Sequence, residues 1–225
     1  MKVKIKRFAG TGSEPYWQTF VCEDIPEKTV AAVLDDLNFT DDLYDINGEP
    51  APGIQWECSC MQKMCGACAM VINGTPALAC SVFLRDIKGD TLVLEPLSKF
   101  PVVADLIVDR SIIEKNLRCA EIYAGKYESA DKKEFEHMYS AAKCIKCGLC
   151  LEVCPNYIKG ENFFGALFAN NAYLVHSMSK DRKKDIKKEY DEHFAKGCSK
   201  SFACRDVCPM EIPTLSSVLK MNRRK

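Results

Sequence analysis

Cysteine is the residue type in this sequence whose number and spacing could do chemistry. The chain has 14 cysteines among 225 residues, and eleven of them fall into three groups with short, regular steps. Thiolates at such spacing hold zinc or iron-sulfur clusters. The chain begins without the apolar run of a secretory signal, so we expect metal ligation in a reducing compartment rather than disulfides.

The first group is Cys60, Cys65, Cys68 and Cys80, with the spacing C-x4-C-x2-C-x11-C. Three thiolates in one tight loop and a fourth from a neighbouring strand or turn form the plant-type ferredoxin pattern, which predicts a 2Fe-2S cluster. Gly66 allows a backbone geometry between two ligands that a Cβ would hinder, and we expect backbone N–H groups to point toward the cluster. Structural zinc competes, but zinc knuckles use a shorter first step.

The second group is Cys144, Cys147, Cys150 and Cys154, followed directly by Pro155. Its spacing, C-x2-C-x2-C-x3-C-P, is that of bacterial ferredoxins. In that pattern the fourth cysteine serves a different cluster from the first three. The group therefore requires a partner elsewhere in the chain.

The third group supplies that partner with Cys198, Cys204 and Cys208, in the spacing C-x5-C-x3-C-P. We expect Cys208 to complete a 4Fe-4S cluster with the first three cysteines of the second group. Cys154, Cys198 and Cys204 then remain, and Ser201 stands where a regular run has its second cysteine. Three thiolates predict a 3Fe-4S cluster. A 4Fe-4S cluster with Ser201 or another ligand on the fourth iron stays open, although an alkoxide is a hard ligand for such a cluster.

The other cysteines and the histidines lack ligand spacing. Cys22, Cys58 and Cys119 are predicted to be buried thiols, with Cys58 nearest to a ligand position. We expect the histidines to be ordinary packed or exposed side chains: His137, His176 and His193. No catalytic residue is expected on this chain.

Composition excludes some classes of function. Lys+Arg and Asp+Glu are equal at 31 each, so no net charge favours binding to nucleic acid. A content of 47% hydrophobic residues over 225 positions is enough for two modest domains. The sequence contains no run of about 18 apolar residues, so we expect no transmembrane segment.

The hydrophobic pattern predicts an α+β protein whose two domains carry the cysteine groups separately. Residues 2–8, 69–72 and 91–94 have strand character, and residues 30–37 have helical spacing. We therefore expect a ferredoxin-like domain over residues 1–100, with a small sheet and one packed helix.

The second half is predicted to be all-helical, as one domain over residues 101–225. Cysteine-bearing loops are expected between its helices, which we place at residues 102–123, 134–142, 163–178 and 180–194.

In order and spacing, these motifs resemble the iron-sulfur subunit of succinate dehydrogenase and fumarate reductase. The resemblance covers nearly the whole chain. Beyond the ligands it includes residues 65–74 (CGACAMVING), the pair Ala79 and Cys80, and residues 100–106 (FPVVADL). The missing cysteine at Ser201 also agrees with that family.

The resemblance implies a β-grasp 2Fe-2S domain followed by a bacterial-ferredoxin-like helical domain. It implies a one-electron relay through 2Fe-2S, 4Fe-4S and 3Fe-4S clusters, in that order. The partners would be a flavoprotein subunit with FAD, where succinate and fumarate interconvert, and a membrane anchor subunit with a quinone. The chain would then be cytoplasmic and peripheral on the inner face of the cytoplasmic membrane.

Two departures from the family lie on the quinone side. Tryptophans are common after the ligand at Cys154, but residues 155–159 read PNYIK, and a histidine often follows the ligand at Cys198, where this chain has Ser199. These departures favour an anaerobic fumarate reductase. They also leave an alternative open, an iron-sulfur relay subunit of another flavin-dependent reductase with a soluble electron donor. A third class, in which metal only stabilises the fold, is disfavoured by the cluster-type spacing.

Overall fold

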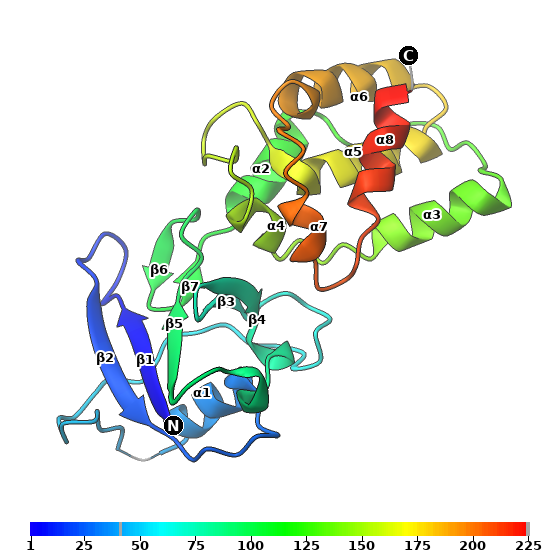
Figure 1. Ribbon diagram of the computed structural model, residues 1–225. Coiled ribbons are helices and arrows are strands. Elements are labelled where there is room, and N and C mark those ends of the chain that lie inside the picture. Colours follow the sequence, from blue (N-terminus) through cyan, green and yellow to red (C-terminus); the bar gives the residue numbers. More distant parts are fainter. Residues whose placement is uncertain (41, 224–225) are drawn as a thin grey trace. The chain divides into compact units, whose positions relative to one another are not determined.

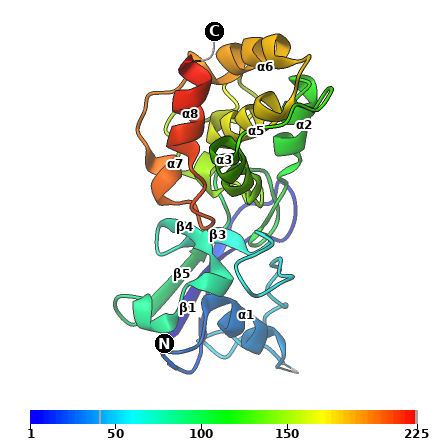
Figure 2. The same ribbon diagram turned by 90° about the vertical axis from the view of Figure 1, so that its right-hand side faces the viewer.

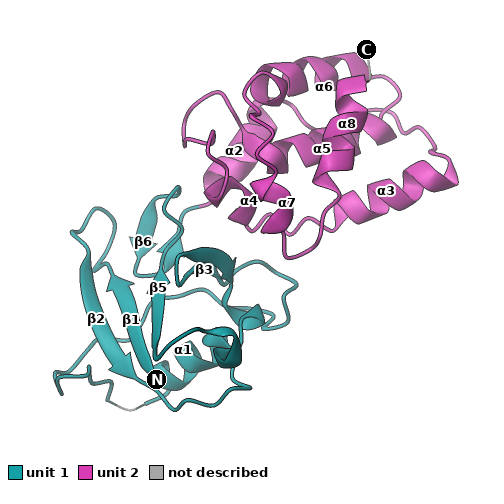
Figure 3. Cartoon of the chain, viewed as in Figure 1, with its two compact units in different colours: residues 1–109 teal, residues 110–225 magenta. Residues whose placement is uncertain are grey.

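The computed structural model describes residues 1–40 and 42–223 (Figure 1). The chain divides into two compact units, Met1–Asp109 and Arg110–Lys225 (Figure 3). The sequence placed a domain boundary after residue 100. Residues 101–109 lie between the expected boundary and the observed one, and they contain a hairpin that belongs to the first unit.

The first unit is built on a mixed five-stranded sheet with the order β2-β1-β5-β3-β4. The β1 and β5 strands are parallel, and the other neighbours are antiparallel. Buried and more exposed side chains alternate along β1 and β5, as in a sheet with one covered face. The strands are β1 (Lys2–Arg7), β2 (Tyr16–Val21), β3 (Ala69–Ile72), β4 (Thr75–Leu78) and β5 (Thr91–Glu95).

One helix, α1 (Val30–Asn38), completes the core of this unit. Thr29 caps it, because its side chain accepts a hydrogen bond from the Ala32 N–H at 3.1 Å. The apolar face of α1 is buried, including Val33 and Leu34. A sheet with one packed helix confirms the expected architecture of the first half.

The last part of the first unit is a two-stranded hairpin, β6 (Val102–Ala104) and β7 (Ile107–Val108). The helix expected over residues 102–123 is therefore wrong in its first part, and only α2 (Ser111–Cys119) is helical there. Asp105 turns the hairpin with a φ of 41°. The β-branched residues around it favour extended backbone over a helix.

Asp105 also fixes this hairpin to the sheet. Its carboxylate accepts from Arg7 Nε at 2.9 Å, from the Phe8 N–H at 2.9 Å and from the Gln55 N–H at 2.8 Å. Arg7 and Asp105 are each only 2% exposed. The buried pair ties residues on three separate segments of the first unit together.

The second unit is a set of helices around α5 (Gly165–Met178), which is buried along most of its length. The α3, α6 and α8 helices pack against it (Figure 1 and Figure 2). The helical predictions for residues 134–142, 163–178 and 180–194 are confirmed. Besides α2 and α5, the helices are α3 (Lys132–Ala142), α4 (Leu149–Glu152), α6 (Lys183–Tyr190), α7 (Ala203–Asp206) and α8 (Thr214–Arg223).

The α6 helix continues as a π-helical segment, Asp191–Ala195, before the third cysteine group. None of the helices in residues 1–40 and 42–223 has the length and apolar character needed to cross a membrane.

Candidate metal centres

The β3–β4 hairpin brings two cysteines of the first group together. Cys68 directly precedes β3, and Cys80 lies in a short 3-10 turn, Ala79–Ser81, directly after β4. The Ala79 N–H donates to the Cys68 carbonyl at 3.0 Å, which extends the hairpin by one step. As a result the Cys68 and Cys80 Sγ atoms are 3.4 Å apart. Cys68 and Cys80 are both buried, so the inner side of this site is closed to water.

The loop before β3 supplies Cys60 and Cys65 and aims its amides at sulfur. The Gln62 and Met64 N–H groups donate to Cys60 Sγ at 3.4 and 3.2 Å. The Ala67 N–H donates to Cys65 Sγ at 3.4 Å. Backbone donors thus point at the cysteine sulfurs of this loop, whereas the spacing predicted donors that point at the sulfides of a cluster.

Left-handed backbone makes this loop possible. Met61, Lys63 and Gly66 have φ values of 52°, 62° and 79°. The turn at Lys63 directs its N–H to Cys80 Sγ at 3.3 Å, across the loop. Only glycine adopts such a φ without steric cost, so Gly66 has the conformational role expected from the sequence.

The environments of the sulfurs differ. The Gln62 and Met64 N–H groups lower the pKa of the Cys60 thiol to about 7. Burial, together with the neighbouring Cys80, raises the pKa of Cys68 to about 12. Four thiolates this close repel one another, and a bound iron cation or cluster removes that repulsion. The donor set therefore fits a 2Fe-2S cluster.

In the helical unit, one cavity gathers four cysteines from two distant segments. Apolar side chains such as Leu167 and Ile212 complete its wall. Burial raises the pKa of the Cys147 thiol to about 11. The cysteines that line the cavity are Cys144, Cys147, Cys150 and Cys208. The structure thus brings together the four residues that the sequence grouped for a 4Fe-4S cluster.

A second cavity in the same unit is lined by Cys154, Cys198 and Cys204, with Ser201 on its wall. The aromatic side chains of Phe163, Phe194 and Phe202 make the rest of this cavity largely apolar. Burial raises the pKa of the Cys204 thiol, and the nearby Cys154 and Cys198 add to that rise. Among the described residues, only these three cysteines line this cavity.

The two cysteine runs of the helical unit have the same pattern of backbone conformation. Lys146 and Gly148 have φ values of 52° and 88° on either side of Cys147, and α4 follows. Lys200 and Phe202 have φ values of 60° and 63° on either side of Ser201, and α7 follows. Ser201 therefore occupies the position in the second loop that Cys147 occupies in the first.

The cysteines outside the three groups differ from expectation. Cys58 and Cys119 are exposed, so the prediction that they are buried thiols is wrong, and Cys22 is partly buried. Cys119 is the last residue of α2. Cys58 lies in the loop that precedes the first ligand position.

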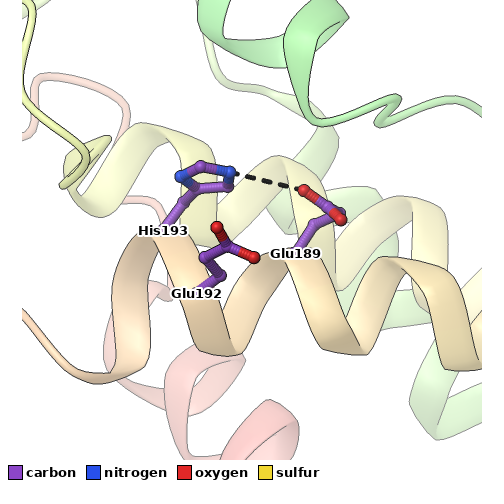
Figure 4. Close-up of side chains that lie close together, drawn as sticks. All are labelled: Glu189, Glu192 and His193. Carbon is purple, nitrogen blue, oxygen red and sulfur yellow. Dashed lines mark ion pairs between the residues drawn. The ribbon is translucent and has the colours of Figure 1, made fainter.

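His193 has polar groups at both of its ring nitrogens. Its Nε2 atom is 3.3 Å from Glu189, and Glu192 lies beside them, so that three ligand-type atoms are within 4.8 Å of one another (Figure 4). The Nδ1 atom is 3.1 Å from the Asn162 carbonyl oxygen. The ring also stacks on Phe164 with centroids 4.1 Å apart. These contacts account for the burial of His193 without a metal ion.

The first unit, with its sheet and one helix, has one cysteine site, and the helical unit has two cavities lined by cysteines. This arrangement defines an iron-sulfur protein with a ferredoxin-like domain and a two-cluster domain. Comparison with protein families agrees. Residues 2–115 match a 2Fe-2S iron-sulfur cluster binding domain, and residues 140–212 match a 4Fe-4S dicluster domain. The fold is the α+β combination that the sequence predicted, and 2Fe-2S and 4Fe-4S clusters are its cofactors.

Relatives identify the family. The succinate dehydrogenase iron-sulfur subunit of Bacillus subtilis is 30% identical over 94% of this chain and 87% of its own length. The fumarate reductase iron-sulfur subunit of Wolinella succinogenes is 29% identical over 94% of this chain and 90% of its own. This chain belongs to the family of iron-sulfur subunits of succinate dehydrogenase and fumarate reductase, which confirms the resemblance.

A solved structure supports the same fold. A chain of the Mycobacterium smegmatis Sdh1 complex in the apo form superposes with a TM-score of 0.77, at 24% identity. The match covers 99% of this chain and 94% of that chain. Both units of the present structure therefore have counterparts in one solved chain.

Proposed function

We propose that this chain relays single electrons between a flavoprotein subunit, where succinate and fumarate interconvert, and a quinone site at a membrane anchor. The observation that carries the proposal is the gathering of eleven cysteines into three separate sites, in the order and units of the family. The chain would lie at the cytoplasmic face of the membrane, bound to these two partners.

The proposed ligand sets follow the three sites. The first site would hold a 2Fe-2S cluster on Cys60, Cys65, Cys68 and Cys80. The four-cysteine cavity would hold a 4Fe-4S cluster on Cys144, Cys147, Cys150 and Cys208. The remaining cavity would hold a 3Fe-4S cluster on Cys154, Cys198 and Cys204. When bound, such clusters supply one-electron oxidation and reduction.

The residues of this chain have three tasks in that relay. Thiolates hold the iron, and the loop amides at Gln62, Met64 and Ala67 donate to ligand sulfur, which favours added negative charge. The apolar walls of the two cavities, with residues such as Leu167 and Phe163, exclude water. A two-electron reaction at a flavin is thereby divided into two one-electron transfers, with no bond made or broken on this chain.

Low-temperature EPR of the anaerobically purified protein tests the proposal, with iron and sulfide quantified beside it. We expect a three-iron signal in the oxidised sample, and 2Fe-2S and 4Fe-4S signals after reduction with dithionite. Co-purification with an FAD-containing subunit is the second expected result. An oxidised protein without a three-iron signal would contradict the 3Fe-4S assignment, and purification free of any flavoprotein would count against the relay partner.

A second candidate keeps the relay but changes its partners, so that a soluble donor feeds another flavin-dependent reductase. Two observations favour it. Ser199 lines the three-cysteine cavity and follows the ligand where the family resemblance implies a histidine, and Ile158, which is 54% exposed, lies in the run where that resemblance implies tryptophans. Fumarate reduction by the assembled complex with a quinol as donor would exclude this candidate. Turnover with a reduced soluble carrier and none with quinol would favour it.

A further inference from the structure

Arg110 is the first residue of the helical unit and reaches a cysteine loop from the start of α2. Its Nη1 atom donates a hydrogen bond to the Cys147 carbonyl oxygen at 3.3 Å. The interaction joins residues 37 positions apart and is partly buried. A permanently charged group is therefore held against the backbone of a proposed 4Fe-4S ligand.

The surroundings of this loop make the charge effective. Cys147 is only 8% exposed, and apolar side chains such as Leu167 and Ile212 line the cavity that it shares with the other three cysteines. Charges interact more strongly where water is excluded, so the buried side of this contact weakens the screening between the guanidinium and the cavity.

Reduction of an iron-sulfur cluster adds one electron and one negative charge to the site. A nearby fixed cation stabilises the reduced form more than the oxidised form, which raises the reduction potential. We propose that Arg110 is a positioning residue that raises the midpoint potential of the 4Fe-4S centre, through its contact with the Cys147 loop, and leaves the three-iron centre unchanged. This inference rests on the proposed assignment of the four-cysteine cavity.

The test is an EPR-monitored redox titration of the anaerobically purified protein and three variants. Arg110→Gln removes the charge and keeps a hydrogen-bond donor, and Arg110→Lys keeps the charge. Arg118→Gln is the matched control, because Arg118 lies on the same helix and pairs with Glu114 at 3.2 Å on the exposed side. The donor and acceptor in the titration are dithionite and ferricyanide, so the readout does not depend on turnover.

We expect Arg110→Gln to disfavour reduction of the 4Fe-4S centre by about tenfold, which for a one-electron couple is a fall of 59 mV. Arg110→Lys should retain most of the wild-type potential, and Arg118→Gln all of it. The three-iron potential should be unchanged in every variant.

Three results would overturn the inference. These are an unchanged 4Fe-4S potential in Arg110→Gln, an equal fall in Arg110→Lys, or loss of the 4Fe-4S signal in both Arg110 variants, which would mean that Arg110 only holds the loop. A wild-type protein without a reducible 4Fe-4S signal would instead contradict the proposed function itself. The two failures are thus distinguishable.

Discussion

Ser201 is the residue on which the proposed three-iron assignment of the third site depends. It stands between two left-handed residues, as Cys147 does in the first run, and it lines the three-cysteine cavity. The second loop therefore keeps the backbone of a four-ligand site with a hydroxyl in place of one thiol. The serine replaces a soft ligand with a hard one, which favours a site that lacks the fourth iron.

Ser201→Cys should convert the three-iron centre into a four-iron one. The new thiolate would start from the same loop position as a natural ligand, so little rearrangement is needed. We expect the oxidised three-iron EPR signal to disappear and the iron content to rise by about one atom per chain. Ser199→Cys is the control, since Ser199 lines the same cavity but matches Ile145 in the first run. Unchanged oxidised spectra in Ser201→Cys would contradict the ligand assignment.

The buried pair of Arg7 and Asp105 gives a second test at the level of single residues. Removing one member leaves the other charge buried, which costs about 3–5 kcal/mol. We expect Asp105→Ala to lower the stability of the first unit by that amount, measured by chemical denaturation of the anaerobic protein. Asp36→Ala removes an exposed partner of Lys28 and should cost less than about 1 kcal/mol. Equal effects from the two variants would show that the Asp105 contacts contribute little.

Residue type and spacing alone predicted the eleven candidate ligands, because short steps between cysteines are local in sequence. Contacts that depend on folding were not predictable in this way. Arg7 and Asp105 are 98 positions apart, and Arg110 meets the Cys147 loop from the start of α2. No pattern in the sequence distinguishes these arginines from other basic residues. The exposure of Cys58 was not predictable either, because it also depends on the folded structure and not on a local pattern.

At the scale of elements, the error over residues 102–110 has a local cause. Apolar residues there occur at steps that fit a helix or a short hairpin equally well. Asp105, with its left-handed φ and its three hydrogen bonds, selects the hairpin. The long helix α5 was predictable because its apolar residues extend over 14 positions.

Gly165, the first residue of α5, lies close to α4, the short helix that carries Cys150. It has a φ of 75°, and a Cβ at this position would collide with Leu151 Cδ2 on α4. Gly165→Ala should therefore combine backbone strain of about 1–2 kcal/mol with overpacking of about 1–3 kcal/mol. We expect a clear fall in thermal midpoint and a broadened 4Fe-4S signal.

Gly160→Ala is the matched control for this effect. Gly160 has a φ of 84°, and a Cβ there would have no atom within 4 Å. It should show the backbone cost of about 1–2 kcal/mol alone, with the cluster signal intact. If the two alanine variants had the same thermal midpoint, contact between Gly165 and α4 would not matter for stability.

At the scale of the whole molecule, the three sites are divided between two cores. The first cysteine group lies within Met1–Asp109, and the other two lie within Arg110–Lys225. In the helical unit the proposed ligand sets cross, because Cys208 joins the cavity of Cys144, while Cys154 joins that of Cys198. Loss of Cys208 or Cys154 should therefore affect the proposed cluster whose other ligands lie in the other cysteine run.

Two alanine variants test this assignment of ligands to the three sites. Cys65→Ala should abolish the 2Fe-2S signal and leave both signals of the helical unit, because each unit has its own core. Cys208→Ala should abolish the 4Fe-4S signal, even though the other proposed ligands of that centre are in the distant second run. EPR at two temperatures distinguishes the reduced centres, since 2Fe-2S signals persist on warming. Loss of the three-iron signal first in Cys208→Ala would reverse the proposed pairing, because Cys208 would then serve the cavity that holds Cys198 and Cys204.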